Sequence, residues 1–289
     1  MRSNLRTRSI ASALAFVVAV SSFATPAWAD DDGLADRIAV LESAESEDAD
    51  ESLEAVLKDQ ISNYAGTWSI YVENMTTGET VEINADEKIY GASLMKLYCL
   101  GATMEAIERG KVERTDMVEN AMSKMITVSD NWSFNYLVKT VGKTAVNLWI
   151  AKNGYGSTKV RHGLSPSGNE GDVKADSKGK NETTARDCGK FLKRIYERTN
   201  VDALSSSRML SLLKSQTRTE KIPAGVPESA ETANKTGETD DVCHDSAIVW
   251  SPNADYVIVV MCSSPGNAWD RADEISAISK TVYETYNGK

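Results

Sequence analysis

Serine and lysine recur three residues apart in this chain, a spacing at which a lysine amine can activate a serine hydroxyl. In a helix, two such residues lie one turn apart on the same face. A lysine desolvated beside a serine has a lowered pKa, so it can accept the hydroxyl proton near neutral pH and make the oxygen a nucleophile. The Ser-x-x-Lys pattern occurs at Ser93/Lys96, Ser177/Lys180 and Ser211/Lys214.

The surroundings of the three pairs favour Ser93. Ser177 lies in an irregular stretch rich in Gly, Ser, Asp and Lys, and Ser211 lies within a helical run. Ser93 instead follows a strand-like hairpin and opens a helix, whose N-terminus favours negative charge developing at a hydroxyl. We therefore predict Ser93 as the nucleophile and Lys96 as its base or proton relay.

Two further triplets, each present once, follow this pair along the chain. They are Ser129-Asp130-Asn131 and Lys235-Thr236-Gly237. The three motifs in this order are typical of class A β-lactamases and penicillin-binding proteins, and residues 52–288 resemble that superfamily. Three further phrases support the resemblance: Tyr90-Gly91-Ala92, Met125-Ile126-Thr127 and Ile222-Pro223-Ala224-Gly225.

The resemblance implies a fold of the α/β (α+β) class, the serine β-lactamase/transpeptidase-like fold. There, an antiparallel sheet from both termini is flanked by helices, and the site lies between the sheet and an all-helical subdomain. The implied activity is that of a class A β-lactamase-like serine acyl hydrolase, which opens β-lactam rings through a Ser93 acyl-enzyme. Two alternatives remain open: a D-Ala-D-Ala carboxypeptidase of the penicillin-binding type, and a β-lactam-binding sensor without hydrolysis.

The resemblance also implies roles for the catalytic residues. Ser129 would pass a proton to the leaving nitrogen, and Asn131 would orient the acyl amide, whereas Asp130 would brace the junction of two helices. The backbone N–H groups of Ser93 and Glu238 would form the oxyanion hole, usually the largest contribution to acyl transfer.

Substrate binding would fall to an edge strand. Lys235 and Thr236 would hold the substrate carboxylate by charge-assisted hydrogen bonds, and Gly237 would keep the strand slim. The next residue departs from the family, because β-lactamases usually carry a small side chain where this chain has Glu238. An acid at that place could repel anionic substrates.

A second departure concerns hydrolysis of the acyl-enzyme. Class A β-lactamases use a glutamate in a Glu-x-x-x-Asn phrase to activate the attacking water, and that phrase is missing here. The loop offers Glu170, with Lys174 at the Asn place. Residues 181–187 resemble the end of the family's loop, and counting residues back from them places Glu170 near the position of the family's glutamate, which supports it as the deacylation base. Counting residues forward from Asn131 does not place it there. The favoured interpretation is an ordinary solvated loop acid.

Hydrophobic periodicity indicates the elements that must position these residues. A helix begins with Ser52 as a possible N-cap and ends at Gly66. Residues 93–213 are mostly helical, with a surface loop over 161–180, and a last helix covers 270–286. Strands are predicted over 68–73, 80–84, 231–239, 244–250 and 256–262.

The start of the chain has the composition of a secretory signal peptide. Arginines precede an apolar run over 11–24, which is shorter than a spanning helix needs, and Ala27-Trp28-Ala29 follows as a cleavage signature. We expect cleavage after Ala29 and an exported protein without a stable membrane anchor. The predicted parts are a signal peptide over 1–29, an acidic flexible spacer over 30–51 and a hydrolase domain over 52–289.

Charge restricts the partners. The formal net charge of the chain is −10, and loss of the three arginines of the signal peptide would move it to −13. Such an acidic protein repels phosphate backbones, which argues against nucleic acid as the main partner. The expected partner is a small β-lactam or a peptidoglycan-type peptide, bound by a monomer without metal or cofactor.

Four cysteines in an exported chain could pair in three ways. Cys243 and Cys262 are the best candidate pair, because they lie near the ends of two neighbouring predicted strands, and Cys99 and Cys188 remain. Four buried free thiols are the alternative.

Overall fold

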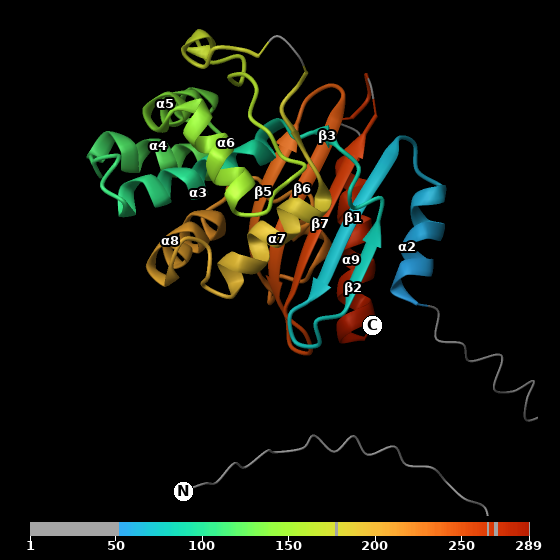
Figure 1. Ribbon diagram of the computed structural model, residues 1–289. Coiled ribbons are helices and arrows are strands. Elements are labelled where there is room, and N and C mark those ends of the chain that lie inside the picture. The colour runs from blue at the N-terminus through green and yellow to red at the C-terminus, as the bar shows by residue number, and fades with distance from the viewer. Residues whose placement is uncertain (1–51, 177–178, 265, 269–270, 289) are drawn as a thin grey trace, which may run out of the picture. The chain divides into compact units, whose positions relative to one another are not determined.

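The computed structural model describes residues 52–176, 179–264, 266–268 and 271–288 (Figure 1). The predicted signal peptide over 1–29, the predicted spacer over 30–51 and Ser177 lie outside the described residues. Within the described part of the chain, no helix is long and apolar enough to cross a membrane.

A five-stranded antiparallel sheet in the order β2-β1-β7-β6-β5 forms the centre of the domain. Its strands are β1 (Thr67–Asn74), β2 (Thr80–Ile83), β5 (Glu231–Glu238), β6 (Val242–Trp250) and β7 (Tyr256–Ser263). β1, from the start of the domain, pairs along its whole length with β7, from its end, so that Ile70 lies opposite Val260. The prediction of a sheet drawn from both ends of the chain is confirmed.

Both faces of this sheet are buried. In β7, Val257 and Val259 belong to the hydrophobic core on one face. Ile258 and Val260 belong to the core on the other face. Because successive side chains of a strand point to opposite faces, a continuous apolar strand needs cover on both sides.

Helices supply that cover (Figure 1). α2 (Leu53–Ser62) and α9 (Ala272–Asn287) lie on one face, and the Ser52 hydroxyl caps α2 as predicted, accepting a hydrogen bond from the Ala55 N–H at 3.3 Å. α7 (Ala185–Tyr196) lies against β1, β6 and β7 on the other face. The other helices are α3 (Met95–Glu108), α4 (Asp116–Thr127), α5 (Asn131–Val141), α6 (Lys143–Lys152) and α8 (Ala203–Lys214).

α3 is the central helix of the helical subdomain. Its residues 95–104 are all buried, as expected of a helix that is apolar on every side. Because α3 begins directly after the turn that holds Ser93, tight packing around this helix gives the serine a rigid support. The predicted fold class is confirmed, including the all-helical subdomain beside the sheet.

Three details differ from the predictions. α2 ends at Ser62 rather than near Gly66. The strands β3 (Ile89–Tyr90) and β4 (Glu182–Thr183) form a small second sheet that was not predicted, because two residues are too few to show alternation. Finally, the two cysteines of the candidate disulfide lie opposite each other on β6 and β7, but all four cysteines are buried free thiols.

Candidate active site

The Ser93 turn joins β3 to α3 through one turn of 3-10 helix, η1 (Ala92–Leu94). The turn is closed by a hydrogen bond from the Leu94 N–H to the Gly91 carbonyl at 2.8 Å. Ala92 has φ of +42°, a left-handed conformation that an L-residue adopts at a cost. Such conformations persist where the surrounding structure enforces them, and they cluster at functional sites.

Lys96 is fully buried, and its amine lies among oxygen atoms of two motifs. Its Nζ is 2.8 Å from Ser93 Oγ, 2.6 Å from the Ser129 carbonyl oxygen and 3.0 Å from Ser129 Oγ. A fourth hydrogen bond, 2.7 Å long, reaches Asn131 Oδ1. The structure thus brings together the four residues that the sequence suggested for the catalytic side of the site.

The electrostatics of Lys96 suit a base. Burial, followed by the positive charge of Lys235, holds the pKa of Lys96 well below its usual range. Both causes penalise the ammonium form. A neutral amine next to the Ser93 hydroxyl can therefore accept its proton near neutral pH.

Ser129 lies in the connection between α4 and α5, with φ of +59°. Its hydroxyl is between two lysines, 3.0 Å from Lys96 Nζ and 2.9 Å from Lys235 Nζ. Asp130 caps α5, accepting a hydrogen bond from the Ser133 N–H at 2.7 Å, which fits the bracing role expected of it. Ser129 is therefore placed to receive a proton from one amine and donate its own to a bound group.

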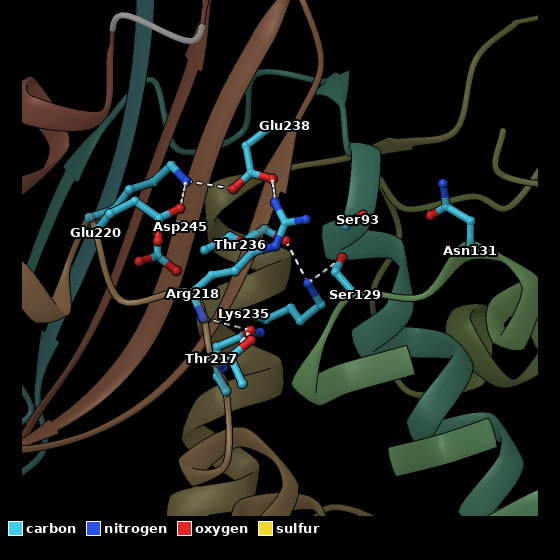
Figure 2. Close-up of polar contacts among 12 residues, drawn as sticks. Ser93, Ser129, Asn131, Thr217, Arg218, Glu220, Lys235, Thr236, Glu238 and Asp245 are labelled. Carbon is cyan, nitrogen blue, oxygen red and sulfur yellow. Dashed lines mark hydrogen bonds and ion pairs between the residues drawn. The ribbon is translucent and has the colours of Figure 1, made fainter. Parts of the chain in front are cut away.

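The opposite wall of the site is β5 (Figure 2). Burial lowers the pKa of Lys235 to about 7, and its ammonium also donates to the Thr236 carbonyl at 2.8 Å. The buried Thr236 hydroxyl has no hydrogen-bond partner among the described residues. A Cβ atom at Gly237 would lie 3.1 Å from the Gly91 carbonyl oxygen and 3.2 Å from the Ser93 nitrogen, so only a slim residue fits beside the nucleophile turn.

Glu238 does not carry an unmatched negative charge, contrary to the expected repulsion of anionic substrates. Its carboxylate turns to two cations, Arg218 at 2.7 Å and Lys221 at 2.5 Å (Figure 2). Burial opposes ionisation of this acid, but Lys221 and Arg218 outweigh it and lower the pKa of Glu238. The two cations offset the charge that was expected to repel substrate.

Glu170 is not brought into the cluster. It lies in η2 (Glu170–Asp172), and its Oε1 accepts a hydrogen bond from the Ser167 N–H at 2.6 Å. Hydrogen bonds from the backbone of Glu170 itself and of Ser167 lower its pKa, which makes it a weaker base. No hydrogen bond among the described residues joins Glu170 to Ser93 or Lys96.

The loop that carries Glu170 is attached to α5, whose first residue is Asn131. Asn131 Nδ2 donates to the Pro166 carbonyl at 3.4 Å. Asn135 Nδ2 donates to the Leu164 carbonyl at 2.8 Å and lies 3.1 Å from Asn169 Oδ1. The irregular loop predicted over 161–180 is therefore anchored on α5 by amide side chains.

One of the competing Ser-x-x-Lys pairs is excluded by its surroundings. Ser211 lies in α8, and Lys214 pairs with Glu231 at 2.8 Å while its amine lies over the Trp250 ring. The Lys214 amine therefore binds Glu231 and Trp250 rather than Ser211, and its side chain is partly exposed, whereas Lys96 is fully buried.

Sequence reasoning missed several supporting residues. His244 Nε2 is 2.9 Å from the carbonyl oxygen of Tyr90, which lies three residues before Ser93. Burial lowers the pKa of His244 to about 4. This neutral imidazole braces the strand that leads to the nucleophile. Arg218 and Lys221 were also missed, because their partner Glu238 lies far along the chain. Among the described residues, no group of His, Cys, Asp and Glu side chains could hold a metal ion.

Comparison with known proteins agrees with this geometry. The Beta-lactamase enzyme family matches residues 51–120 and 115–286 of the chain. The chain therefore belongs to the β-lactamase enzyme family. It is a serine hydrolase of the β-lactamase and penicillin-binding protein superfamily, as the sequence predicted, and its fold is that of class A β-lactamases. No curated protein matches its sequence.

Solved structures share the fold. PBP-A is 23% identical with a TM-score of 0.73, and the alignment covers 82% of this chain and 96% of PBP-A. A β-lactamase from Sphaerobacter thermophilus is 21% identical with a TM-score of 0.71, over 81% of this chain and 96% of that one. An ancestral (GNCA) class A β-lactamase is 20% identical with a TM-score of 0.70, over 81% and 100% of the two chains.

Proposed function

We propose that this protein is a serine acyl hydrolase that opens β-lactam rings through a Ser93 acyl-enzyme and releases the product slowly. One observation carries the proposal: the Lys96 amine lies within hydrogen-bond distance of both Ser93 Oγ and Ser129 Oγ. A nucleophile and a base within such a distance are the geometric requirement for covalent catalysis.

Acylation follows from this arrangement. Lys96 takes the proton of Ser93, and Ser93 Oγ attacks the lactam carbonyl. The oxygen that gains negative charge is stabilised by the backbone N–H groups of Ser93 and Glu238. As the carbon–nitrogen bond breaks, Ser129 gives its proton to the leaving nitrogen and is reprotonated by Lys96, which returns to the neutral state.

Substrate capture depends on β5. The Lys235 ammonium can hold a carboxylate, and the unpartnered Thr236 hydroxyl can donate to the same group. Penicillins and peptides that end in D-Ala both carry such a carboxylate. This feature supports β-lactams and peptidoglycan-type peptides as the substrate class.

Release of the acyl group lacks an evident base. The one acid that the sequence offered, Glu170, is bound by the backbone of its own loop. This observation favours a second candidate function, a D-Ala-D-Ala carboxypeptidase or penicillin-binding protein, in which penicillin stays attached. A PBP-A variant is similar to this chain and was solved as an acyl-enzyme complex with penicillin-G.

Mass spectrometry tests the proposal. After incubation with penicillin, we expect one adduct of the mass of penicillin, located by peptide mapping on Ser93 and still present after minutes. Release of D-Ala from a D-Ala-D-Ala peptide would identify a carboxypeptidase, whereas a lasting adduct without peptide cleavage would identify a sensor. Absence of any adduct and of any turnover would contradict the proposed function.

A further inference from the structure

Glu238, the last residue of β5, forms two ion pairs in which its side chain is almost fully buried. The side chain of Glu238 is 5% exposed and that of Lys221 is 3% exposed, whereas that of Arg218 is 40% exposed. The 2.5 Å and 2.7 Å contacts occupy both carboxylate oxygens. Removing one member of a buried pair leaves an uncompensated charge, so this contact holds its partners firmly in place.

Both cations of this cluster belong to one segment, residues 216–222, which we call the strap. At one end of the strap, the Thr217 N–H donates to the carbonyl of Thr127 at 3.0 Å. Thr127 lies two residues before Ser129. Further along the strap, the Arg218 carbonyl accepts a hydrogen bond from Asn234 Nδ2 at 3.1 Å. Asn234 is the residue before Lys235. The strap therefore links the wall that carries Ser129 to the wall that carries the Lys-Thr-Gly motif.

We propose that Glu238 is a positioning residue, whose side chain binds the strap and thereby fixes its own backbone N–H as an oxyanion donor. The inference rests on the proposed function, because only acyl transfer at Ser93 needs that donor. The carboxylate thus takes the opposite role from the repulsive one that the sequence suggested.

β5 is an edge strand of the sheet, so its backbone is paired on one side only. On that side Glu238 lies opposite Cys243 of β6, and the Thr239 N–H donates to the Val242 carbonyl at 2.9 Å. On the other side, Gly237 passes close to the Ser93 nitrogen without a side chain to hold it. Pairing with β6 holds this end of β5 to the sheet, and the Glu238 side chain adds an attachment to the strap. We infer that both restraints are needed to hold the Glu238 N–H at the distance from the Ser93 turn that two converging donors require.

The expected loss of acylation rate can be estimated from the effect of removing an oxyanion-hole donor. Loss of one oxyanion-hole donor costs about 10²- to 10³-fold in rate, and a small misplacement costs part of that. Glu238→Gln keeps the size of the side chain and removes its charge. We expect this variant to acylate about 10- to 100-fold more slowly, mainly in the rate of the chemical step rather than in penicillin binding.

An exposed acid on the same strand serves as a control. Glu231 begins β5, also forms an ion pair, with Lys214 at 2.8 Å, and is at the end of the strand away from Glu238. Glu231→Gln should acylate at the wild-type rate. The comparison separates the loss of a particular contact from the general loss of an acid on β5.

The decisive readout is the infrared band of the acyl-enzyme carbonyl, measured with stopped-flow acylation by benzylpenicillin on wild type, Glu238→Gln and Glu231→Gln. Hydrogen bonds in the oxyanion hole lower the frequency of this band. We expect it to rise in Glu238→Gln and to stay unchanged in Glu231→Gln. An unchanged band and rate in a folded Glu238→Gln variant would overturn the inference.

A second variant covers the case in which Glu238→Gln does not fold. Arg218→Gln removes the half-exposed partner and keeps the buried Lys221–Glu238 pair, so we expect a smaller change of the same sign in band and rate. No change there would also overturn the inference. If wild type itself forms no acyl-enzyme, the proposed function fails together with the role that rests on it. Acylation of wild type with unaffected variants removes only the positioning role.

Discussion

The two halves of a hydrolytic cycle are served by two very different regions of this molecule. Around Lys96, side chains from η1, α5 and the connection before α5 lie 2.7 to 3.0 Å from one buried amine. Around Glu170, the carboxylate binds its own loop backbone, and its pKa is lowered. The first region is built for acylation, while the second offers no comparable base for release.

The contrast shows where a motif is enough to predict chemistry and where it is not. The lysine cluster depends on residues that rigid helices and strands hold in place. The loop depends on an acid whose position a few residues of irregular chain decide. Substitutions in the Lys96 region should abolish or strongly slow acylation, whereas substitution of Glu170 should change neither acylation nor release.

The largest effect is expected from Ser93→Ala. The variant should lose all acylation by penicillin and keep its fold, because this hydroxyl is the only covalent nucleophile proposed. Mass spectrometry and circular dichroism measure the two outcomes. Ser211→Ala, which alters a serine of another Ser-x-x-Lys pair, is the control and should be acylated like wild type. An adduct on Ser93→Ala would remove the assignment.

A somewhat smaller loss is expected from Lys96→Met, which keeps the length of the side chain and removes the amine. Loss of a general base typically costs about 10²- to 10⁴-fold, so acylation should slow by that factor. The fold should be kept, with a lower melting temperature, because the oxygens of Ser93, Ser129 and Asn131 lose a hydrogen-bond partner. Undiminished acylation measured by stopped flow would show that another group activates Ser93.

The third effect depends on pH. Because burial lowers the pKa of Lys235 to about 7, its charge is present below that pH and is lost as the pH rises through it. The acylation efficiency with penicillin should therefore decline above about pH 7, and that with a neutral ester should not decline for this reason. Lys235→Ala should weaken acylation by penicillin more than by the ester, and Lys235→Arg should be milder. Parallel profiles for the two substrates would show that Lys235 acts structurally.

Much of the fold and the core of the site could be predicted from the sequence, for identifiable reasons. β5 was predicted over 231–239 and is found over Glu231–Glu238, because a strand bounded by turns leaves a local pattern. Ser93 and Lys96 lie one helical turn apart, so their contact is a local property of the chain. That these two residues lie next to Ser129 and Lys235 could be predicted only from the family resemblance.

The remainder could not be predicted, since it depends on contacts without a local signal. Glu238 meets Lys221 and Arg218 from 17 and 20 residues away, across a turn that no periodicity describes. Charge alone therefore suggested repulsion at Glu238, where the structure has a buried ion pair. The position of Glu170 was undecided because counting from the two ends of an irregular loop gave different answers.

The smallest expected effect is also the most direct test of the account. We predict that stopped-flow kinetics with penicillin show a burst of about one equivalent per Ser93, followed by a slow steady state. The reason is that acylation uses Lys96 and Ser129, whereas release lacks a base typically worth about 10²- to 10⁴-fold. Glu170→Gln should change neither phase. If the steady state of wild type is rapid and Glu170→Gln removes it while leaving the burst, then Glu170 is the deacylation base, the protein is an efficient β-lactamase, and the account is wrong.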